Sequence, residues 1–308
     1  MKADWVAASV RARSMAQRRA GAGTSRAMAM QPTLDSAKSL LRESSYGPRL
    51  GGTSGLAAAE RAVQETALWQ LRVLAGWLPA SGTALARAAA GIYEIENIVA
   101  LAHRLAGGAP APEFYTLGAL ATAWPRLRTA GSPEELAAIL RASAWGDVGT
   151  VEPGPMRDAL TVAWVQRLAT SAPAARPWCG AACALVAARI LLVDDVAPSA
   201  QVLHLLRPVL GRSWETAGGI AGFTAALPHP LREVVLGVAS PMDLWRAEAR
   251  AYAAVENDGF QLLRGSMPGP DAVLGAIAVL ALDAWRVRAA LAAAAAGAGS
   301  SEVLDAAA

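Results

Sequence analysis

The stretch 40–50, LLRESSYGPRL, and the stretch 139–149, ILRASAWGDVG, are two versions of one segment placed 99 residues apart. An aromatic residue precedes a glycine in both, Tyr46 in the first and Trp145 in the second. Four of the first eight positions are identical: Leu41 and Leu140, Arg42 and Arg141, Ser44 and Ser143, Gly47 and Gly146. Turns depend on particular residues rather than on general composition. The shared turn therefore predicts a chain built from repeated units.

The composition predicts the secondary structure of those units. Alanine, leucine and arginine dominate the 308 residues, and β-branched residues are comparatively few. Alanine, leucine and arginine favour helices because they lose little side-chain freedom there. A chain of this length buries roughly three quarters of its unfolded surface on folding. We predict an all-α fold.

Apolar periodicity and helix boundary signals locate the expected helices. The glycine-rich stretch 20–25 is expected to be a flexible break, and Tyr46-Gly47-Pro48 is expected to end a helix. Ser132 is expected to cap the helix that follows it. The tail 296–308 is expected to be frayed. The expected long helices cover residues 5–19, 56–78, 83–106, 156–170, 178–193, 242–263 and 271–296.

The same unit recurs a third time, because residues 209–241 resemble residues 116–145. Each unit is a short helix with a turn followed by two long antiparallel helices, and the units cover 1–110, 111–208 and 209–308. A period near 95 residues is too long for a solenoid. It predicts three homologous helical subdomains around a pseudo-threefold axis. For the third unit, a chance match between alanine-rich helices is the alternative.

The net charge of +3 is too small to predict nucleic-acid binding. Near the N-terminus, five arginines form a modest cluster: Arg11, Arg13, Arg18, Arg19 and Arg26. The cluster is typical of a solvated helix face, and contact with an acidic partner or a lipid surface is the alternative. Cys179 and Cys183 share a helix face and are expected to be buried thiols rather than a disulfide, as in a cytoplasmic protein. We expect no membrane span and no signal segment.

No pattern in the sequence predicts catalytic, cofactor-binding or metal-binding residues. The three histidines are far apart, and the glycines form neither a P-loop nor a dinucleotide-binding motif. Asp194 and Asp195 resemble the first half of the aspartate-rich motif with which helical prenyl-transferring enzymes hold Mg²⁺ and a diphosphate. No third acid follows them at the expected spacing. We therefore expect a solvated loop, with a prenyl-diphosphate enzyme as the alternative.

Polar residues interrupt the apolar helix at 93–108, YEIENIVALAHRLAGG. Glu94 and Asn97 lie three residues apart and share a face of the helix. They are expected to form a polar seam that hydrogen-bonds to a neighbouring helix.

That stretch resembles the tyrosine-aspartate-x-x-asparagine…arginine signature of a family of central-stalk proteins in V-type and archaeal-type ATPases. Members of this family are called C in archaeal and bacterial enzymes and d in eukaryotic ones. The matching residues are Tyr93, Glu94, Asn97 and Arg104. Three further stretches resemble the family: residues 5–17 with Arg11 and Arg13, the turn Tyr46-Gly47 repeated at Trp145-Gly146, and the closing helix 280–297. Either Asp283 or Trp285 occupies the position of the acid in the closing helix of the family.

The resemblance implies three homologous helical subdomains that form a funnel on the membrane proteolipid ring. It implies a rotor subunit without catalytic residues or cofactors, which couples the axle of the ATPase head to the proteolipid c-ring. The expected partners are that ring and the axle subunits, with the membrane surface contacted only indirectly. The expected location is cytoplasmic, peripheral on the inner face of the cell membrane. A generic helical scaffold is a further alternative.

Overall fold

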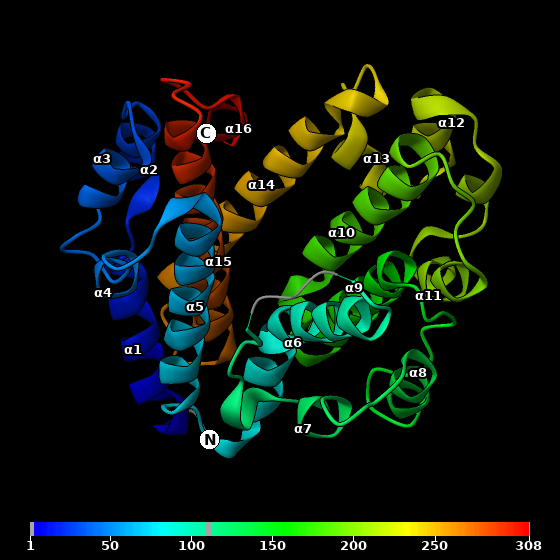
Figure 1. Cartoon of the computed structure of the whole chain (residues 1–308), viewed down its shortest axis with the longest axis horizontal. Helices are drawn as coiled ribbons and strands as arrows, with labels where there is room; N and C mark the ends of the chain where they lie inside the picture. Colours follow the sequence, from blue (N-terminus) through cyan, green and yellow to red (C-terminus); the bar gives the residue numbers. More distant parts are fainter. Residues whose placement is uncertain (1–2, 109–112, 308) are drawn as a thin grey trace. The chain divides into compact units, whose positions relative to one another are not determined.

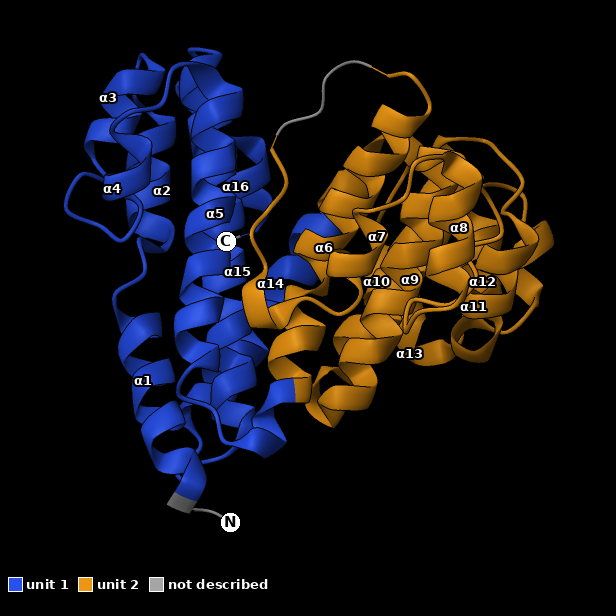
Figure 2. Ribbon diagram, turned by 60° about the horizontal axis from the view of Figure 1, so that its bottom comes forward, with its two compact units in different colours: residues 1–83, 248–308 blue, residues 84–247 orange. Residues whose placement is uncertain are grey.

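The computed structural model describes residues 3–108 and 113–307, and within them it contains helices and turns but no β-strand (Figure 1). The predicted all-α class is confirmed. The chain divides into two compact units, coloured separately in Figure 2: unit 1 is residues 1–83 with 248–308, and unit 2 is residues 84–247. The three repeats and their pseudo-threefold arrangement stay a prediction.

Unit 1 is organised around α15 (Pro270–Ala295), which contacts α1, α2, α3, α5 and α16. Small residues allow this packing. A Cβ on Gly275 of α15 would lie 2.5 Å from the carbonyl oxygen of Gly259 on α14, so these two backbones touch. The other helices of the unit are α1 (Val6–Gln17), α2 (Gly21–Ala29), α3 (Leu34–Ser39), α4 (Gly47–Leu50), α5 (Gly55–Ala75), most of α14 (Leu244–Arg264) and α16 (Glu302–Ala306), with 3₁₀ turns at Ala3–Trp5 and Ala80–Gly82.

Unit 2 is organised around α10 (Arg176–Ala188), which packs against α9, α11 and α13 and continues as a π-helix over Arg189–Val193. The Ser132 hydroxyl accepts the Glu135 N–H at 3.1 Å, which confirms the predicted cap of α8. The other helices are α6 (Thr83–Leu105), α7 (Trp124–Leu127), α8 (Pro133–Arg141), α9 (Pro153–Ser171), α11 (Ala200–Leu210), α12 (Gly219–Ala226) and α13 (His229–Val235), with 3₁₀ turns at Gly118–Leu120, Pro173–Ala175, Ser213–Thr216 and Pro241–Asp243.

Three local expectations are wrong. The glycine-rich stretch 20–25 is not a flexible break, because α2 begins at Gly21. The helix before Tyr46 already ends at Ser39, and Gly47 begins α4 instead of closing a helix. The tail contains α16, which the Ser301 hydroxyl caps by accepting the Leu304 N–H at 3.3 Å. In the first and third cases, side chains distant in the sequence stabilise the segment.

Candidate functional site

A buried carboxylate in unit 1 joins the last long helix to the first short helices. Asp283 on α15 is 1% exposed. Its Oδ1 accepts the Gly21 N–H at 2.7 Å, and its Oδ2 accepts the Ala20 N–H at 3.0 Å and the Tyr46 hydroxyl at 2.9 Å. The first N–H groups of a helix lack partners within the helix and favour a negative charge. Asp283 therefore fixes the start of α2 and the position of Tyr46; we call this set of contacts the first joint.

Unit 2 contains a second joint built in the same way. Glu94 on α6 is fully buried. Its Oε2 accepts the Thr122 N–H at 2.7 Å, and its Oε1 accepts the N–H groups of Ala123 at 2.6 Å and Trp124 at 2.8 Å. The Trp145 indole donates to the same Oε1 at 3.3 Å. Glu94 thus fixes the start of α7 and the position of Trp145.

The two joints give the repeated turn a common purpose. Each turn delivers one aromatic donor, Tyr46 or Trp145, to a buried carboxylate on a long helix. The serine two residues before the aromatic residue is also used identically. Ser44 donates to the Leu41 carbonyl at 2.7 Å and accepts the Tyr46 N–H at 3.2 Å. The same two bonds of Ser143, to Leu140 and from Trp145, measure 2.8 and 3.1 Å.

The two glycines of the repeated turn are needed for different reasons. A Cβ on Gly47 would lie 2.0 Å from the Arg42 carbonyl oxygen, so only a glycine fits against that backbone. Gly146 has open space around it, but its φ of +78° belongs to the left-handed region that favours glycine. The turns are alike in sequence and in hydrogen bonding, but not in backbone conformation.

A second polar residue follows each carboxylate after three positions. Asn97 donates to the Tyr115 carbonyl at 2.9 Å and accepts the Tyr115 N–H at 2.6 Å. Arg286 is buried, pairs with Glu256 and donates to the Ala307 carbonyl at 3.1 Å. The expected seam of Glu94 and Asn97 exists, but it binds loop backbone rather than a neighbouring helix.

The closing helix resolves the choice between Asp283 and Trp285. Asp283 makes the joint, whereas Trp285 packs edge-on against Tyr252 with ring centroids 4.9 Å apart. The joint acid of α15 is therefore Asp283.

The junction between the second and third repeats has apolar packing in place of a joint. The last long helix of the second repeat, α10, has no acidic residue, and it packs against α11 and α13. A Cβ on Gly180 would lie 3.0 Å from the Leu231 side chain, so α10 approaches α13 closely. The Trp214 indole donates to the Gly211 carbonyl at 3.1 Å, within its own segment.

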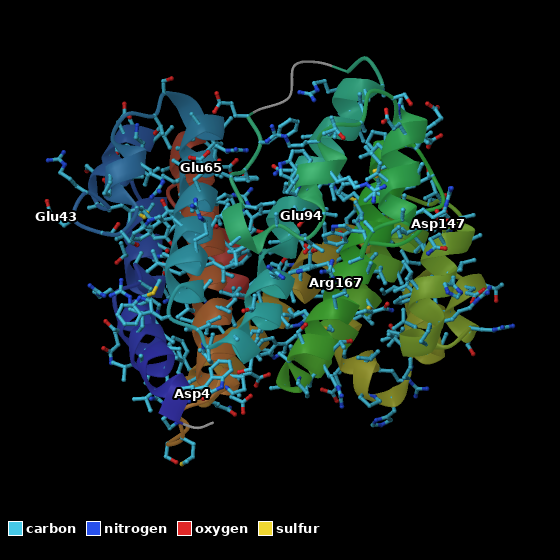
Figure 3. The ribbon with its side chains drawn as sticks, turned by 90° about the horizontal axis from the view of Figure 1, so that it is seen from below. Asp4, Glu43, Glu65, Glu94, Asp147 and Arg167 are labelled. Carbon is cyan, nitrogen blue, oxygen red and sulfur yellow. The ribbon has the colours of Figure 1, made fainter. Side chains whose placement is uncertain are left out.

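Arg167 on α9 completes the second joint from another side (Figure 3). Its guanidinium lies 4.7 Å from the centroid of the Trp145 ring and donates to the Thr122 hydroxyl at 3.2 Å. Burial lowers the pKa of Arg167, and the charge of Glu94 acts in the opposite direction. The Glu94 carboxylate thus has a cation near it as well as four hydrogen-bond donors.

The remaining residues of the family signature have separate places. Arg13 donates to the Leu263 carbonyl at 2.9 Å and to the Gly265 carbonyl at 2.6 Å, at the C-terminal end of α14. Tyr93 packs edge-on against Tyr115, and the Arg104 guanidinium lies over the Phe114 ring at 5.0 Å. Arg11 lines a cavity in unit 1. Apart from Arg11, these residues hold segments of the fold together.

The residues considered for catalysis or metal binding are not brought together. Asp194 pairs with Arg189, which also pairs with Asp158, and Asp195 is exposed. Within residues 3–108 and 113–307, no cluster of three or more histidine, cysteine or acidic side chains could hold a metal ion. The exposed histidines lie on different helices: His103 on α6, His204 on α11 and His229 on α13.

The two cysteines are free and buried on one face of α10, as predicted. Burial raises the pKa of Cys179 to about 11 and that of Cys183 to about 12. Thiols with such pKa values carry almost no thiolate at neutral pH, which is the form that reacts and binds metals. One helical stretch among the described residues, Pro173–Val193, is long and apolar enough to cross a membrane. It contains α10, the helix around which unit 2 packs.

The first joint gives a testable pH dependence. Burial raises the pKa of Asp283 above its ordinary 3.8, outweighing the opposite effects of the Gly21 and Ala20 N–H groups and of the Tyr46 hydroxyl. A carboxyl whose pKa is higher in the folded chain stabilises it fully below the unfolded-state pKa, and this contribution is lost as the pH rises through the folded-state pKa. The stability advantage of the wild type over Asp283→Asn should therefore shrink as the pH rises from 3.8.

Urea unfolding of both proteins at a series of pH values measures this advantage. An advantage that grows with pH would contradict the expectation, because it would mean that the hydrogen bonds to Asp283 outweigh its burial.

A comparison of the chain with protein-family models finds no match, and a comparison with curated proteins finds none either.

Proposed function

We propose that this chain is a non-catalytic central-stalk rotor subunit of a V/A-type rotary ATPase or ATP synthase. It couples the axle of the ATPase head to the membrane proteolipid ring during proton or sodium transport. Its place is cytoplasmic, peripheral on the inner face of the cell membrane as part of the complex. The resemblance at four collinear stretches is the starting point of this proposal.

The observation that carries the proposal is the pair of equivalent joints. Glu94, on the last long helix of the first repeat, binds the start of the second repeat. Asp283, on the last long helix of the third repeat, binds the start of the first repeat. Contacts in this order are what a closed arrangement of three homologous subdomains requires. They support the pseudo-threefold architecture that the resemblance implies.

The chemistry of the joints suits a part that transmits torque. Such a part must keep one shape under load. A buried carboxylate that accepts three or four hydrogen bonds holds one arrangement, because any displacement leaves a charge and several N–H groups buried without partners. Both joints link a long helix to a segment distant in sequence, so each prevents two elements from sliding past each other.

The alternative functions have less support. The prenyl-diphosphate enzyme needs Asp194 and Asp195 free to hold Mg²⁺, whereas Asp194 pairs with Arg189. Mg²⁺-dependent binding of a prenyl diphosphate that Asp195→Ala abolishes would restore that alternative. A generic helical scaffold has no feature of its own in its favour.

Affinity purification of the tagged full chain from detergent-solubilised membranes of its own cell tests the proposal. We expect the proteolipid, the axle proteins and the catalytic head proteins of the ATPase to co-purify with it. The matched control is the tagged Glu94→Gln variant, in which the joint is weakened and co-purification should fall. Recovery of the tagged chain as a free protein, without any part of the ATPase, would contradict the proposal.

A further inference from the structure

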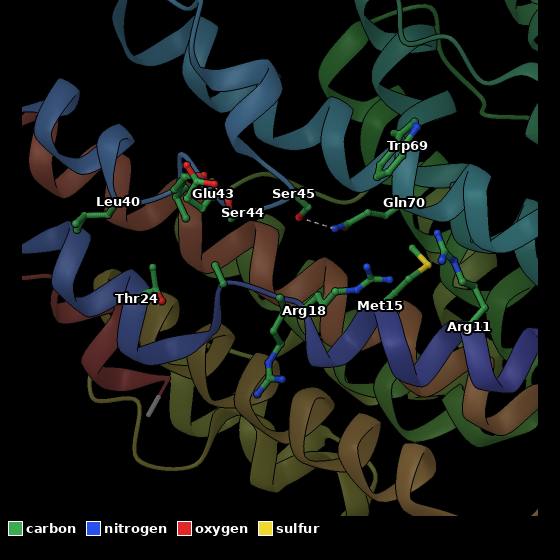
Figure 4. Close-up of a pocket in the computed structure, with 13 residues that line it drawn as sticks. Arg11, Met15, Arg18, Thr24, Leu40, Glu43, Ser44, Ser45, Trp69 and Gln70 are labelled. Carbon is green, nitrogen blue, oxygen red and sulfur yellow. Dashed lines mark hydrogen bonds between the residues drawn. The ribbon is translucent and has the colours of Figure 1, made fainter.

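An open cavity of about 600 Å³ lies within unit 1, between α1, α2, α5 and the segment 40–45 (Figure 4). Arg11 and Met15 reach it from α1, and Trp69 and Gln70 from α5. All of its walls belong to one compact unit. Its volume suits a small organic molecule.

The charges around the cavity are mainly positive. Arg11, Arg18 and Arg19 line it, against the single carboxylate of Glu43. Arg19 is already engaged, since its guanidinium lies over the Phe260 ring at 4.6 Å and donates to the Ala16 carbonyl. Arg18 is exposed and bonds only within its own helix, to Ser14. Two guanidinium groups, those of Arg11 and Arg18, therefore remain for a ligand.

Two buried polar atoms on the cavity wall have no hydrogen-bond partner. The Nε of Arg11 is one. The other is the Oε1 of Gln70, a side chain that is only 4% exposed. The Gln70 amide is held in place by its Nε2, which donates to the Ser45 hydroxyl at 3.0 Å (Figure 4). Buried polar atoms normally have partners, and a donor and an acceptor left open on one cavity wall point to a ligand.

We propose that this cavity binds a small organic anion. Its phosphate or carboxylate group pairs with Arg11 and Arg18, because a guanidinium presents a planar set of donors that matches both kinds of group. A hydroxyl or amino group of the same molecule donates to the Oε1 of Gln70. Met15 and Trp69 supply the apolar walls.

The cavity is adjacent to the first joint. Ala20, which donates its N–H to Asp283, lines the cavity. So does Ser44, whose hydroxyl accepts the Tyr46 N–H. A bound anion therefore stabilises the segments that Asp283 holds. This binding goes beyond the rotor proposal and does not depend on it.

Isothermal titration calorimetry on the purified full chain tests the inference. The probes are glycerol 3-phosphate and citrate, which combine an anionic group with a hydroxyl, and inorganic phosphate, which lacks the organic part. We expect at least one of the two organic anions to bind more tightly than inorganic phosphate. The preference between them identifies the anionic group as phosphate or carboxylate.

The variants separate a site from general attraction. Arg11→Gln should weaken binding about tenfold, the usual effect of losing one charge-assisted hydrogen bond. Arg26→Gln is the matched control, because Arg26 is exposed on α2 outside the cavity and its loss changes the net charge equally. Equal weakening by both variants would overturn the proposal.

Two more arms keep the test decisive. If Arg11→Gln fails to fold, Arg18→Gln alters an exposed residue, and Gln70→Glu puts a negative charge where the anion binds; both should weaken binding. Vesicles containing phosphatidylglycerol are the lipid probe. Binding to the vesicles without binding to either soluble anion would overturn the proposal and assign the arginines to a membrane surface.

Discussion

Glu94→Gln should lower the free energy of unfolding by about 3 kcal/mol, because a buried carboxylate bonded to several donors is replaced by a neutral amide. The amide oxygen can take the place of Oε1, which accepts three hydrogen bonds. The amide NH₂ then faces the Thr122 N–H, donor against donor. The nearby cation of Arg167 also loses its counter-charge.

Urea unfolding followed by circular dichroism measures the change. Glu96→Gln is the matched control, since Glu96 lies on the same helix and its ion pair with Arg157 is close to half exposed. Half-exposed ion pairs contribute at most about 1 kcal/mol. If Glu94→Gln and Glu96→Gln have equal effects, the second joint does not hold the fold as described.

Gly47→Ala should be at least as damaging, with a loss of about 3 kcal/mol or more, because its Cβ meets backbone atoms that cannot turn away. The new carbon would lie 2.0 Å from the Arg42 carbonyl oxygen and 2.9 Å from that of Leu41. Relief requires the turn to move, and Tyr46, next in the chain, would then move away from Asp283.

Gly146→Ala is the control that the repeat itself provides. Its Cβ would meet nothing within 4 Å, so only the positive φ opposes it, at a cost of about 1–2 kcal/mol. Thermal unfolding of the two variants should therefore rank Gly47→Ala well below Gly146→Ala. The reverse order, or equal effects, would mean that the two turns are constrained in the same way.

The helices could be predicted from the sequence because their signals are local. Apolar spacing and the Ser132 cap lie within the segments they describe. The stretch 20–25 was misjudged because the group that supports the start of α2 is Asp283, at a sequence separation of 262 residues from Gly21. The tail was misjudged because Arg286 binds the Ala307 carbonyl. Composition predicts flexibility in both stretches, and distant side chains reverse it.

The joints could be predicted only in part. The sequence pattern indicates Glu94, Tyr46 and Trp145 but does not pair them, since pairing depends on tertiary structure. The cavity was missed because Gln70 lies within an apolar helical stripe and has no motif around it. A buried glutamine within such a stripe is the one sequence signal that could have pointed there.

The way unit 1 is assembled has a consequence for synthesis on the ribosome. Unit 2 is one continuous segment, so all of its contacts can form as soon as residue 247 has left the ribosome. Unit 1 cannot be completed then, because Tyr46 and the start of α2 wait for Asp283. The first helices made are the last to find their partners. Until α15 appears, their apolar faces stay uncovered and depend on chaperones to remain soluble.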